Sequence, residues 1–275
     1  MAEIVNIKTA EAMGDAPIIT QLLQGGVTRL VLNNPPANAL SDQVIADLHA
    51  ALKRSGEDDT RVIILAANGH LFCAGHDLKE VTAARQADDG GRAFFTDLMA
   101  RCSDMMQAIV NHRCPVIAEV NGLATAAGAQ LVASCDLAIA SEDAAFCTPG
   151  VHIGLFCSTP MVALSRNVHR KHAMEMLLTG EAITPSHARE IGLVNRVVPV
   201  DYLEKITLQY ARNIAKKSAH TLKVGKQAFY QQAEMGLADA YAHAAEVMVE
   251  NMLAEDAKEG IGAFLESREP EWRDG

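Results

Sequence analysis

The sequence VIAEVNGLATAAGAQLVASCD, residues 116–136, carries the strongest fold signal in the chain. It begins with the apolar run Val116–Val120, which is typical of a strand covered on both faces. Asn121-Gly122 ends this run, and residues 124–129 are then all small, with Gly128 among them. The stretch therefore predicts a buried strand, a glycine turn and a small-residue helix start.

The same stretch suits the binding of a negatively charged oxygen. Small side chains let a ligand or a neighbouring backbone come close. The first N–H groups of a helix are unpaired and can donate to an oxyanion or a phosphate. Close packing of helix on strand, without any chemistry, is the alternative interpretation. The stretch has no G-x-G-x-x-G and no Lys-Ser or Lys-Thr after its glycines, so it is neither a dinucleotide fingerprint nor a P-loop.

Composition limits the class of protein. The 275 residues are 49% hydrophobic, which is enough for one large domain with a helical appendage. The formal net charge of −10 argues against a nucleic-acid partner. No apolar run is long enough for a membrane span. We expect a core over residues 17–199 and a helical oligomerisation region over residues 200–275.

Six scattered cysteines form no C-x-x-C pair, and the ten histidines form no H-E-x-x-H, so we expect reduced thiols and no metal site. Reduced thiols and the absence of an apolar signal segment favour a soluble, cytoplasmic protein. Residues 1–16 are interpreted as a loosely ordered leader, which leaves a short organelle signal open.

Local patterns place the first strands and helices. Gly25-Gly26 predicts a hairpin between strands at 18–23 and 27–32, and Ser41 is a candidate N-cap for a helix. The remaining expected elements are strands at 61–67, 116–120 and 137–140, a helix at 94–110, a helix from about 126, and a loop at 71–77. This alternation of strands and helices predicts an α/β fold with largely parallel sheets.

Only helices are expected beyond Pro199, at about 201–216, 221–233, 237–253 and 255–266. The third of these has one apolar stripe, formed by Leu237, Tyr241, Ala244, Met248 and Met252. A stripe of this kind packs on its own domain or on another subunit.

Several motifs, taken together, resemble the crotonase superfamily, the enoyl-CoA hydratase/isomerase proteins. The resemblance runs from about residue 17 to the end of the chain. Its motifs are Asn38-Ala39-Leu40, Leu71-Phe72-Cys73-Ala74-Gly75-His76-Asp77-Leu78-Lys79, Val120-Asn121-Gly122, Cys135-Asp136-Leu137-Ala138-Ile139-Ala140, Met176-Leu177-Leu178-Thr179-Gly180, Gly192-Leu193-Val194-Asn195-Arg196-Val197-Val198-Pro199 and Glu259-Gly260-Ile261-Gly262-Ala263-Phe264.

The resemblance implies a spiral of ββα units followed by a helical trimerisation region, in a homotrimer or a hexamer built as a dimer of trimers. It also implies an acyl-CoA thioester as ligand, with coenzyme A entering only as part of the substrate and no other cofactor. The thioester carbonyl would lie between two main-chain N–H groups that stabilise its enolate, and these map to Ala74 and Ala127.

Two positions depart from the pattern of the family's hydratases. Those enzymes use two glutamates, and the matching positions here hold Gln130 and Gly150. Neither residue exchanges a proton near neutral pH. The chain therefore looks like a subgroup of hydratase-domain-containing proteins without the glutamate pair. We expect weak or absent hydratase activity in acyl-CoA metabolism, and a non-catalytic acyl-CoA-binding or interaction protein is the alternative.

Other candidate residues each have a plainer interpretation. Gln130 can orient water or substrate, or only satisfy backbone groups. His76 can act as acid or base, or point to solvent. Cys157 can be a nucleophile or part of the pocket wall. Glu119 can be a displaced carboxylate, or point away from the pocket, and His152 is expected to be a packing or surface residue.

The residues expected to contact substrate come from the matched motifs. Lys223, Lys226 and Arg268 are candidates for the CoA phosphates, with a solvated helix face as the alternative for each lysine. Phe264 matches an aromatic residue that contacts the adenine of a neighbouring subunit. Asp77 is also expected to cap the next helix. The full set of substrate-binding candidates is Ala39, Leu40, Phe72, Gly75, Asp77, Leu78, Gly128, Gly150, Phe156, Cys157 and Phe264.

Overall fold

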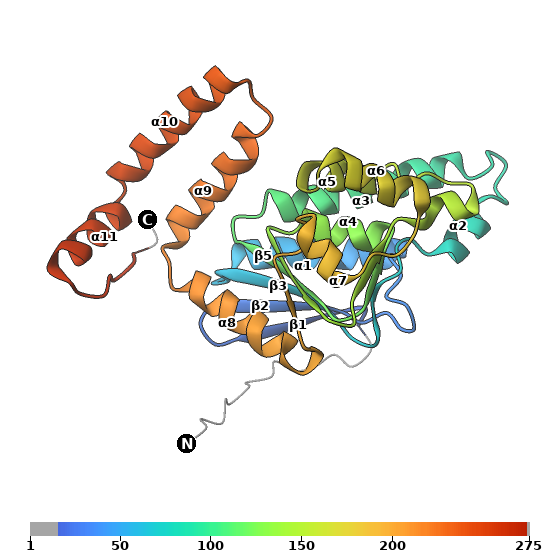
Figure 1. Cartoon of the computed structure of the whole chain (residues 1–275), viewed down its shortest axis with the longest axis horizontal. Helices are drawn as coiled ribbons and strands as arrows, with labels where there is room; N and C mark the ends of the chain where they lie inside the picture. Colours follow the sequence, from blue (N-terminus) through green and yellow to red (C-terminus); the bar gives the residue numbers. More distant parts are fainter. Residues whose placement is uncertain (1–15, 274–275) are drawn as a thin grey trace.

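The computed structural model describes residues 16–273, and residues 1–15 of the expected leader lie outside this range. Within it, an α/β core carries a helical arm at one end (Figure 1). The α/β class predicted from the sequence is confirmed.

Two sheets form the core. The larger sheet has the order β1-β2-β3-β5-β7-β9, with β1 antiparallel to β2 and the other pairs parallel. The smaller sheet has the parallel order β4-β6-β8. The strands are β1 (Ile18–Leu23), β2 (Val27–Leu32), β3 (Val62–Ala67), β4 (Leu71–Cys73), β5 (Val116–Val120), β6 (Leu123–Thr125), β7 (Leu137–Ser141), β8 (Ala145–Cys147) and β9 (Arg196–Val198).

Helices follow the strand pairs and continue to the end of the chain. They are α1 (Asp42–Glu57), α2 (Leu78–Ala84), α3 (Arg92–Val110), α4 (Ala127–Ser134), α5 (Pro160–Asn167), α6 (Arg170–Thr179), α7 (Pro185–Glu190), α8 (Leu203–Ala215), α9 (Ala219–Gln232), α10 (Leu237–Leu253) and α11 (Glu255–Glu266), with short 3-10 turns η1 (Pro149–Ile153) and η2 (Val200–Tyr202).

The core repeats one unit. A long strand enters the larger sheet, a three-residue strand enters the smaller sheet, and a helix follows, as in β5-β6-α4. The expected loop at 71–77 therefore begins with a strand, β4. Three-residue strands are too short to show a period-2 pattern, which explains why β4, β6 and β8 were not predicted.

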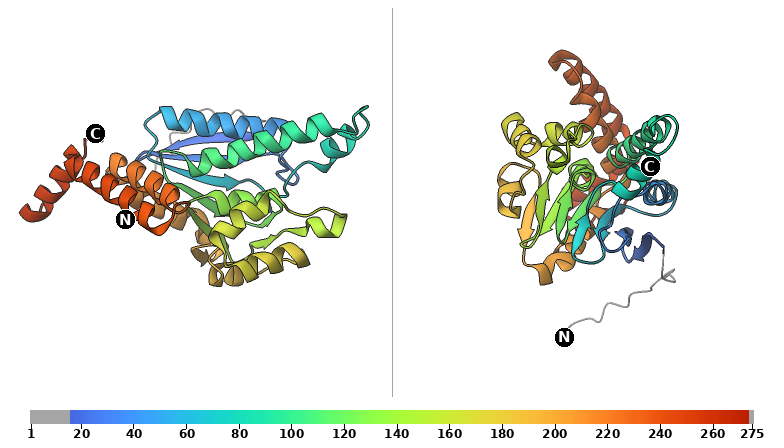
Figure 2. Two further views of the ribbon diagram at one scale, coloured as in Figure 1. Left: turned by 90° about the horizontal axis from the view of Figure 1, so that it is seen from above. Right: turned by 90° about the vertical axis from the view of Figure 1, so that its right-hand side faces the viewer.

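Side chains alternate between the two faces of the larger sheet along each strand. Each face packs against its own hydrophobic cluster. In β5, Val116, Ala118 and Val120 face the core that includes residues of α1, α3 and α4. Ile117 faces the other side, where Leu203 and other residues of α8 pack. Helix α8, which the sequence assigned to the C-terminal region, is thus part of the core, and Figure 2 shows the arm beginning after it.

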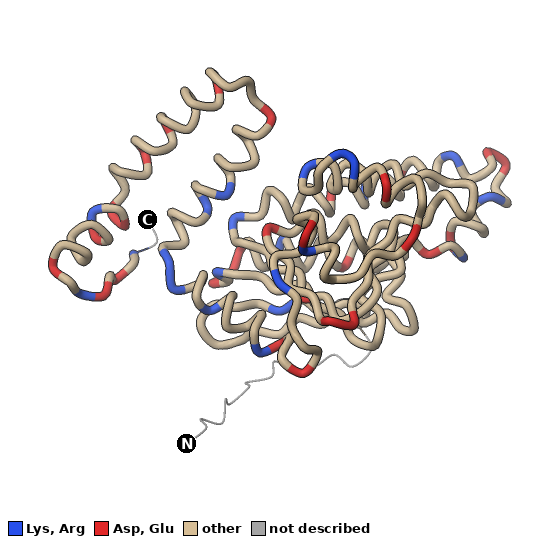
Figure 3. The backbone as a smooth tube through the Cα atoms, viewed as in Figure 1, with Lys and Arg blue, Asp and Glu red and all other residues tan. Residues whose placement is uncertain are grey.

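The arm consists of α9, α10 and α11. Helix α10 carries only acidic charges, at Asp239, Glu246 and Glu250, and its tube is mostly uncharged in Figure 3. Its expected apolar stripe is exposed in the single chain: Leu237 and Tyr241 are each more than 70% exposed. The stripe therefore has no cover within the described part of this chain.

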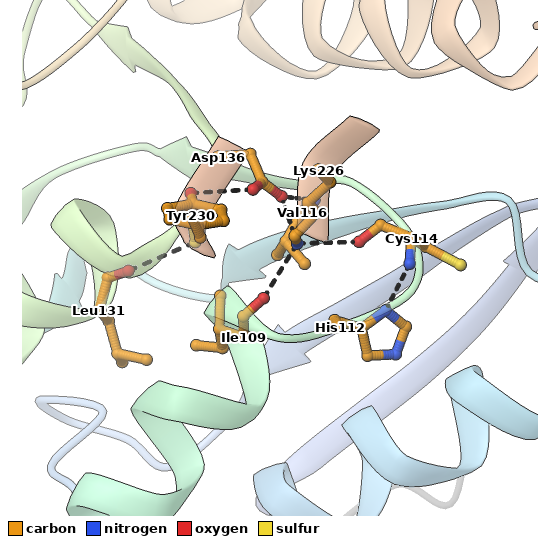
Figure 4. A network of polar contacts seen from close by, with 9 residues as sticks. Ile109, His112, Cys114, Val116, Leu131, Asp136, Lys226 and Tyr230 are labelled. Carbon is orange, nitrogen blue, oxygen red and sulfur yellow. Dashed lines mark hydrogen bonds and ion pairs between the residues drawn. The ribbon is translucent and has the colours of Figure 1, made fainter. Parts of the chain in front are cut away.

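Lys226 of α9 joins the arm to the core (Figure 4). Its Nζ donates to the carboxylate of Asp136 at 2.6 Å and to the carbonyls of Ile109 and Cys114 at 3.0 and 3.1 Å. Tyr230 donates its hydroxyl to the same carboxylate at 3.0 Å. Because all three protons of this ammonium are used, Lys226 is not available for a CoA phosphate, and that candidate role is wrong.

Tyr230→Phe is expected to weaken this attachment. Loss of a hydrogen bond to a charged acceptor costs about 1.5–3 kcal/mol, while Lys226 and the Val116 N–H still neutralise and solvate Asp136. The thermal midpoint should fall by several degrees at fixed protein concentration. Tyr202→Phe, at an exposed position in η2 outside the arm, is the matched control. Equal losses in both variants would contradict the role of the Tyr230 hydroxyl.

Candidate active site

The turn after β4 touches the first residues of α4. Gly75 has φ +84°, a conformation that favours glycine. A Cβ atom added there would lie 3.0 Å from the Cβ of Ala126 and 3.2 Å from the backbone nitrogen of Ala127. The smaller sheet brings these two turns together, because β4 and β6 are neighbours in it. Gly75, a predicted substrate-binding residue, therefore lies where the turn after β4 meets the start of α4.

Gly128 makes this approach possible from the other side. A Cβ atom on Gly128 would overlap the carbonyl oxygen of Cys73 and lie 2.8 Å from the Cβ of Cys73. Gly128 thus has a packing role: it seats the second residue of α4 directly on the end of β4.

Ala74 does not offer a free donor. Its N–H donates to the carbonyl of Ala37 at 3.0 Å, so the prediction that Ala74 holds an oxyanion is wrong. The next residues pair with Leu40: the Leu40 N–H donates to Gly75 at 2.8 Å, and the Asp77 N–H donates to Leu40 at 3.4 Å. The N–H of His76, between them, makes no hydrogen bond within residues 16–273.

The N–H of Ala127, the other predicted oxyanion donor, has no hydrogen-bond partner among the described residues. Ala127 is the first residue of α4, and such an N–H has no partner inside its helix. The preceding amide, of Ala126, donates to the carbonyl of Cys147 at 2.9 Å. The amides of His76 and Ala127 are therefore two donors at this contact that have no partner among the described residues.

Asn38 holds the neighbouring loop in place. It is buried, with φ +48°, and its side-chain amide donates to the carbonyls of Asn68 and Leu71 at 2.9 and 2.8 Å. Its Oδ1 accepts from the N–H of Asn34. This brings Leu40 alongside His76, where the two residues form an isolated parallel bridge. The role of Asn38 was missed from the sequence, although the Asn38-Ala39-Leu40 motif was recognised.

Ala126 is strained, with φ +52° and ψ −117°. A non-glycine residue in such a conformation costs about 1–3 kcal/mol. Glycine removes that cost but adds about 0.5–1 kcal/mol of chain entropy. We therefore expect Ala126→Gly to raise stability by about 1 kcal/mol, measured as a higher thermal midpoint. Ala129→Gly, in the body of α4, should lower it instead, and a fall in both would contradict the strain at Ala126.

Gln130 lies one turn after Ala127 on the same face of α4. Residues at i and i+3 share a helix face, and their side chains lean toward the N-terminus. The Gln130 side chain is 95% buried, because the residue is only 5% exposed, and its Oε1 has no hydrogen-bond partner in the part of the chain the structure describes.

Gly150 lies in η1, beside the segment that follows it. A Cβ atom there would lie 3.0 Å from the Sγ of Cys157 and 3.0 Å from the carbonyl oxygen of Leu155. Its φ is outside the positive range. A side chain at this position is therefore limited by space, not by backbone conformation.

The titratable groups near these turns favour their neutral forms. Burial lowers the pKa of His76, against a smaller opposing effect of the Leu40 backbone. Burial raises the pKa of Cys147 and Cys157, and that of Cys73 to about 12. The three thiols are thus protonated at neutral pH, which disfavours Cys157 as a nucleophile.

Glu119 and His152 lie outside the site. Glu119 is buried on the α8 face of the sheet, where it pairs with Arg29, and burial raises its carboxyl pKa. The Nε2 of His152 lies 2.8 Å from the carbonyl of Thr179, which joins η1 to α6. Glu119 therefore points away from the candidate site, and His152 is a packing residue at the surface.

The remaining candidates divide by exposure. Leu40 and Phe72 are fully buried in the core, and their predicted contact with substrate stays a prediction. Asp77 caps α2 through the N–H of Lys79 at 2.7 Å, as expected. Ala39 is half-buried, Cys157 is buried, and the exposed candidates are Leu78, Phe156 and Phe264.

The charged candidates for the CoA phosphates are mostly occupied. Arg268 pairs with Glu259 and Glu266, at 2.6 and 2.7 Å. Lys223 is exposed on α9 and remains a candidate. Phe264, 83% exposed on α11, has room for a contact from another subunit.

Two surface pockets lie away from the turns. One is lined by Pro17, Asn33, Asn34, Pro35, Ser41, Gln43 and Val44. The other lies against α9, beside Asp136 and Lys226. Neither pocket is lined by Gly75, His76 or Ala127, so the candidate site is described by the backbone contact between its two turns. Residues 16–273 hold no cluster of three metal-binding side chains and no helix long and apolar enough to cross a membrane.

Comparison with known proteins identifies the family of this chain. The enoyl-CoA hydratase/isomerase family model matches residues 23–275, so the chain belongs to that family, with the crotonase superfamily fold. It is 47% identical over 251 residues to rat mitochondrial enoyl-CoA hydratase domain-containing protein 3, covering 90% of this chain and 82% of the relative.

Solved structures show the same fold. An enoyl-CoA hydratase from Mycobacterium smegmatis superposes with a TM-score of 0.88 at 47% identity, covering 94% of this chain and 99% of that one. Human enoyl-coenzyme A hydratase domain-containing protein 3 also gives 0.88, at 45% identity, covering 94% of this chain and all of the human one.

The expected cytoplasmic location is wrong. The rat relative and its mouse and human counterparts, at 46–47% identity, are all named mitochondrial. The inference from reduced cysteines failed because free thiols indicate a reducing environment without specifying the compartment that supplies it.

Proposed function

We propose that this protein binds an acyl-CoA thioester and stabilises its enolate between the backbone N–H groups of His76 and Ala127. The contact between Gly75 and the Ala127 nitrogen is the observation that supports the proposal, because Gly75 precedes His76 in the turn that lies against the start of α4. Fixed donors of this kind contribute about 3–4 kcal/mol each when charge develops on the oxygen.

The chemistry at such an oxyanion hole depends on a proton carrier. Gln130 and Gly150 supply none, so we propose that hydration of enoyl-CoA is weak or absent. His76 is a titratable residue of this turn, and burial lowers the pKa of its imidazole. In an enzyme of this family that catalyses isomerisation or enolate formation, His76 would be the group that moves the proton.

The absence of a proton-exchanging group at Gln130 and Gly150 also favours a second candidate function. A protein that clamps the thioester carbonyl without reacting would act as an acyl-CoA-binding or interaction protein. Turnover on a panel of CoA thioesters, with product identification, separates the two functions, since a binding protein releases its ligand unchanged.

The carbonyl clamp is tested by comparing butyryl-CoA with S-butyl-CoA, the thioether that lacks the carbonyl. Calorimetry should show tighter binding of the thioester. Gly75→Ala should remove this preference, because its methyl group would lie against the Ala127 amide. Gly69→Ala, which has the same positive φ but open space around it, is the control for strain alone. Equal affinity of the unmodified protein for both ligands would refute the clamp.

We also propose that the arm assembles the protein into a homotrimer or hexamer. The exposed stripe on α10 supports this, because a monomer seldom leaves so many large apolar side chains uncovered. Phe264 would then contact the CoA of a neighbouring subunit. Light scattering at micromolar concentration should give a trimer or hexamer mass, and a stable monomer would exclude both proposals.

A further inference from the structure

Residues 267–273, the C-terminal strap, fold back along α11 and end at the junction between the core and the arm. The Glu271 N–H donates to the carboxylate of Glu259 at 2.8 Å. The Arg273 N–H donates to the carboxylate of Asp256, also at 2.8 Å. Both acceptors lie in the first two turns of α11, so the strap is tied to the start of that helix.

Trp272 joins the strap to the junction itself. Its indole ring lies against Gly260 of α11, where an added Cβ atom would be 3.1 Å from the ring. Its Nε1 donates to the carbonyl of Lys216 at 2.7 Å. Because Lys216 lies between α8 and α9, this one side chain connects the last helix of the arm to the base of the arm.

Arg61 holds the same junction from the core side. Its Nε donates to the carbonyl of Ala215 at 2.7 Å, and its Nη2 donates to the carbonyl of Lys217 at 2.6 Å. The carbonyl between these two is the one that accepts from Trp272. Three consecutive carbonyls are therefore fixed from two sides, which restricts rotation of the junction and sets the direction in which α9 leaves the core.

Phe264 lies on α11, in the part of the helix beyond the strap contacts. Its side chain is 83% exposed, so its location depends on where α11 lies. An exposed aromatic ring binds a ligand most tightly when it is held in position beforehand, because ordering it on binding costs free energy. The strap and its tryptophan provide such a constraint on α11.

We propose that Trp272 is a positioning residue, which holds α11 so that Phe264 stacks on the adenine of the coenzyme A bound to a neighbouring subunit. The indole acts through Phe264 and does not touch the ligand. This inference rests on the proposed acyl-CoA site and assembly, and adds the residue that fixes the adenine contact.

The test compares butyryl-CoA with butyryl-pantetheine, which has the thioester but no adenine, by calorimetry. Trp272→Ala should weaken binding of butyryl-CoA about tenfold, as expected for one base–aromatic contact, and leave butyryl-pantetheine within about twofold. Phe264→Ala should give the same selective loss. The double variant should lose no more than either single variant, because the two residues act as one unit.

Two glycines of α11 provide matched variants that keep the tryptophan. Gly260→Val places a side chain against the indole, whereas a Cβ atom on Gly262 meets only the end of the Arg268 side chain, at 4.0 Å. Trp272 is the single tryptophan of the chain, so its fluorescence reports on the strap directly. Gly260→Val should shift the emission to longer wavelength and weaken butyryl-CoA selectively, and Gly262→Val should do neither.

The other outcomes overturn the inference. If Trp272→Ala weakens both ligands equally, or neither, the strap does not act on the adenine. Losses that add in the double variant would show that Trp272 does not act through Phe264. If the unmodified protein binds both ligands equally, the adenine contact is absent, although the carbonyl clamp stands as long as butyryl-CoA binds better than S-butyl-CoA. If neither thioester binds, both proposals fail. Should Trp272→Ala not fold, Gly260→Val decides the question by the same comparison.

Discussion

Crotonyl-CoA is expected to be hydrated at least about a thousandfold more slowly by this protein than by a relative with both glutamates. Addition of water to a conjugated thioester needs a base for the water and an acid for the α-carbon. A positioned acid or base contributes about 10²–10⁴-fold, and Gln130 and Gly150 can do neither. In the proposed site the amides of His76 and Ala127 would stabilise the enolate but move no proton.

The decisive measurement is kcat/KM for crotonyl-CoA, with a glutamate-bearing relative in the same assay. A value near that of the relative would show that another group transfers the proton, and His76 is then the first suspect. His76→Asn distinguishes the two roles of this residue, because it removes the imidazole and keeps the backbone N–H. It should abolish such activity while leaving thioester binding intact.

Introducing glutamates at positions 130 and 150 tests whether their absence is what limits hydration. Gln130→Glu keeps the size of the side chain and is expected to fit. Gly150→Glu requires Cys157 or the Leu155 carbonyl to move, since both lie 3.0 Å from the new Cβ. We therefore expect the double variant to gain hydration more fully when Cys157→Ala, which removes the Sγ atom, is added to it.

Turn and helix-cap patterns predicted much of the fold from the sequence. Gly25-Gly26 forms the predicted hairpin, and Ser41 and Asp77 accept hydrogen bonds at the helix starts that they were expected to cap. These features depend on neighbours in the chain, so sequence spacing is enough to place them.

The errors concern contacts between distant segments. The Ala74 N–H is used by Ala37, across a loop that Asn38 folds back, and no local pattern shows this. Lys226 has the sequence context of a solvated helix lysine, yet it is enclosed by three carbonyl or carboxylate oxygens from two segments of the core. In both cases tertiary packing determines which polar groups remain free, and therefore which residues can form the site.

Gly128→Ala is expected to lower stability by about 3 kcal/mol, at the upper end for an overpacked methyl group. The new Cβ would overlap the Cys73 carbonyl oxygen and lie 2.9 Å from the carbonyl carbon. Both are backbone atoms, so no side-chain rotation relieves the overlap and α4 must move away from β4. For a chain of this size the thermal midpoint should fall by about 10 °C.

A matched control separates this overlap from a general effect of alanine. Gly225 lies inside α9 with nothing within 4 Å of an added Cβ, so Gly225→Ala should leave stability unchanged or raise it by up to about 1 kcal/mol. The movement forced by Gly128→Ala would also separate the amides of His76 and Ala127. The folded fraction of the variant should therefore bind butyryl-CoA and S-butyl-CoA equally. Wild-type stability together with an intact thioester preference would show that the two turns are not held together by this contact.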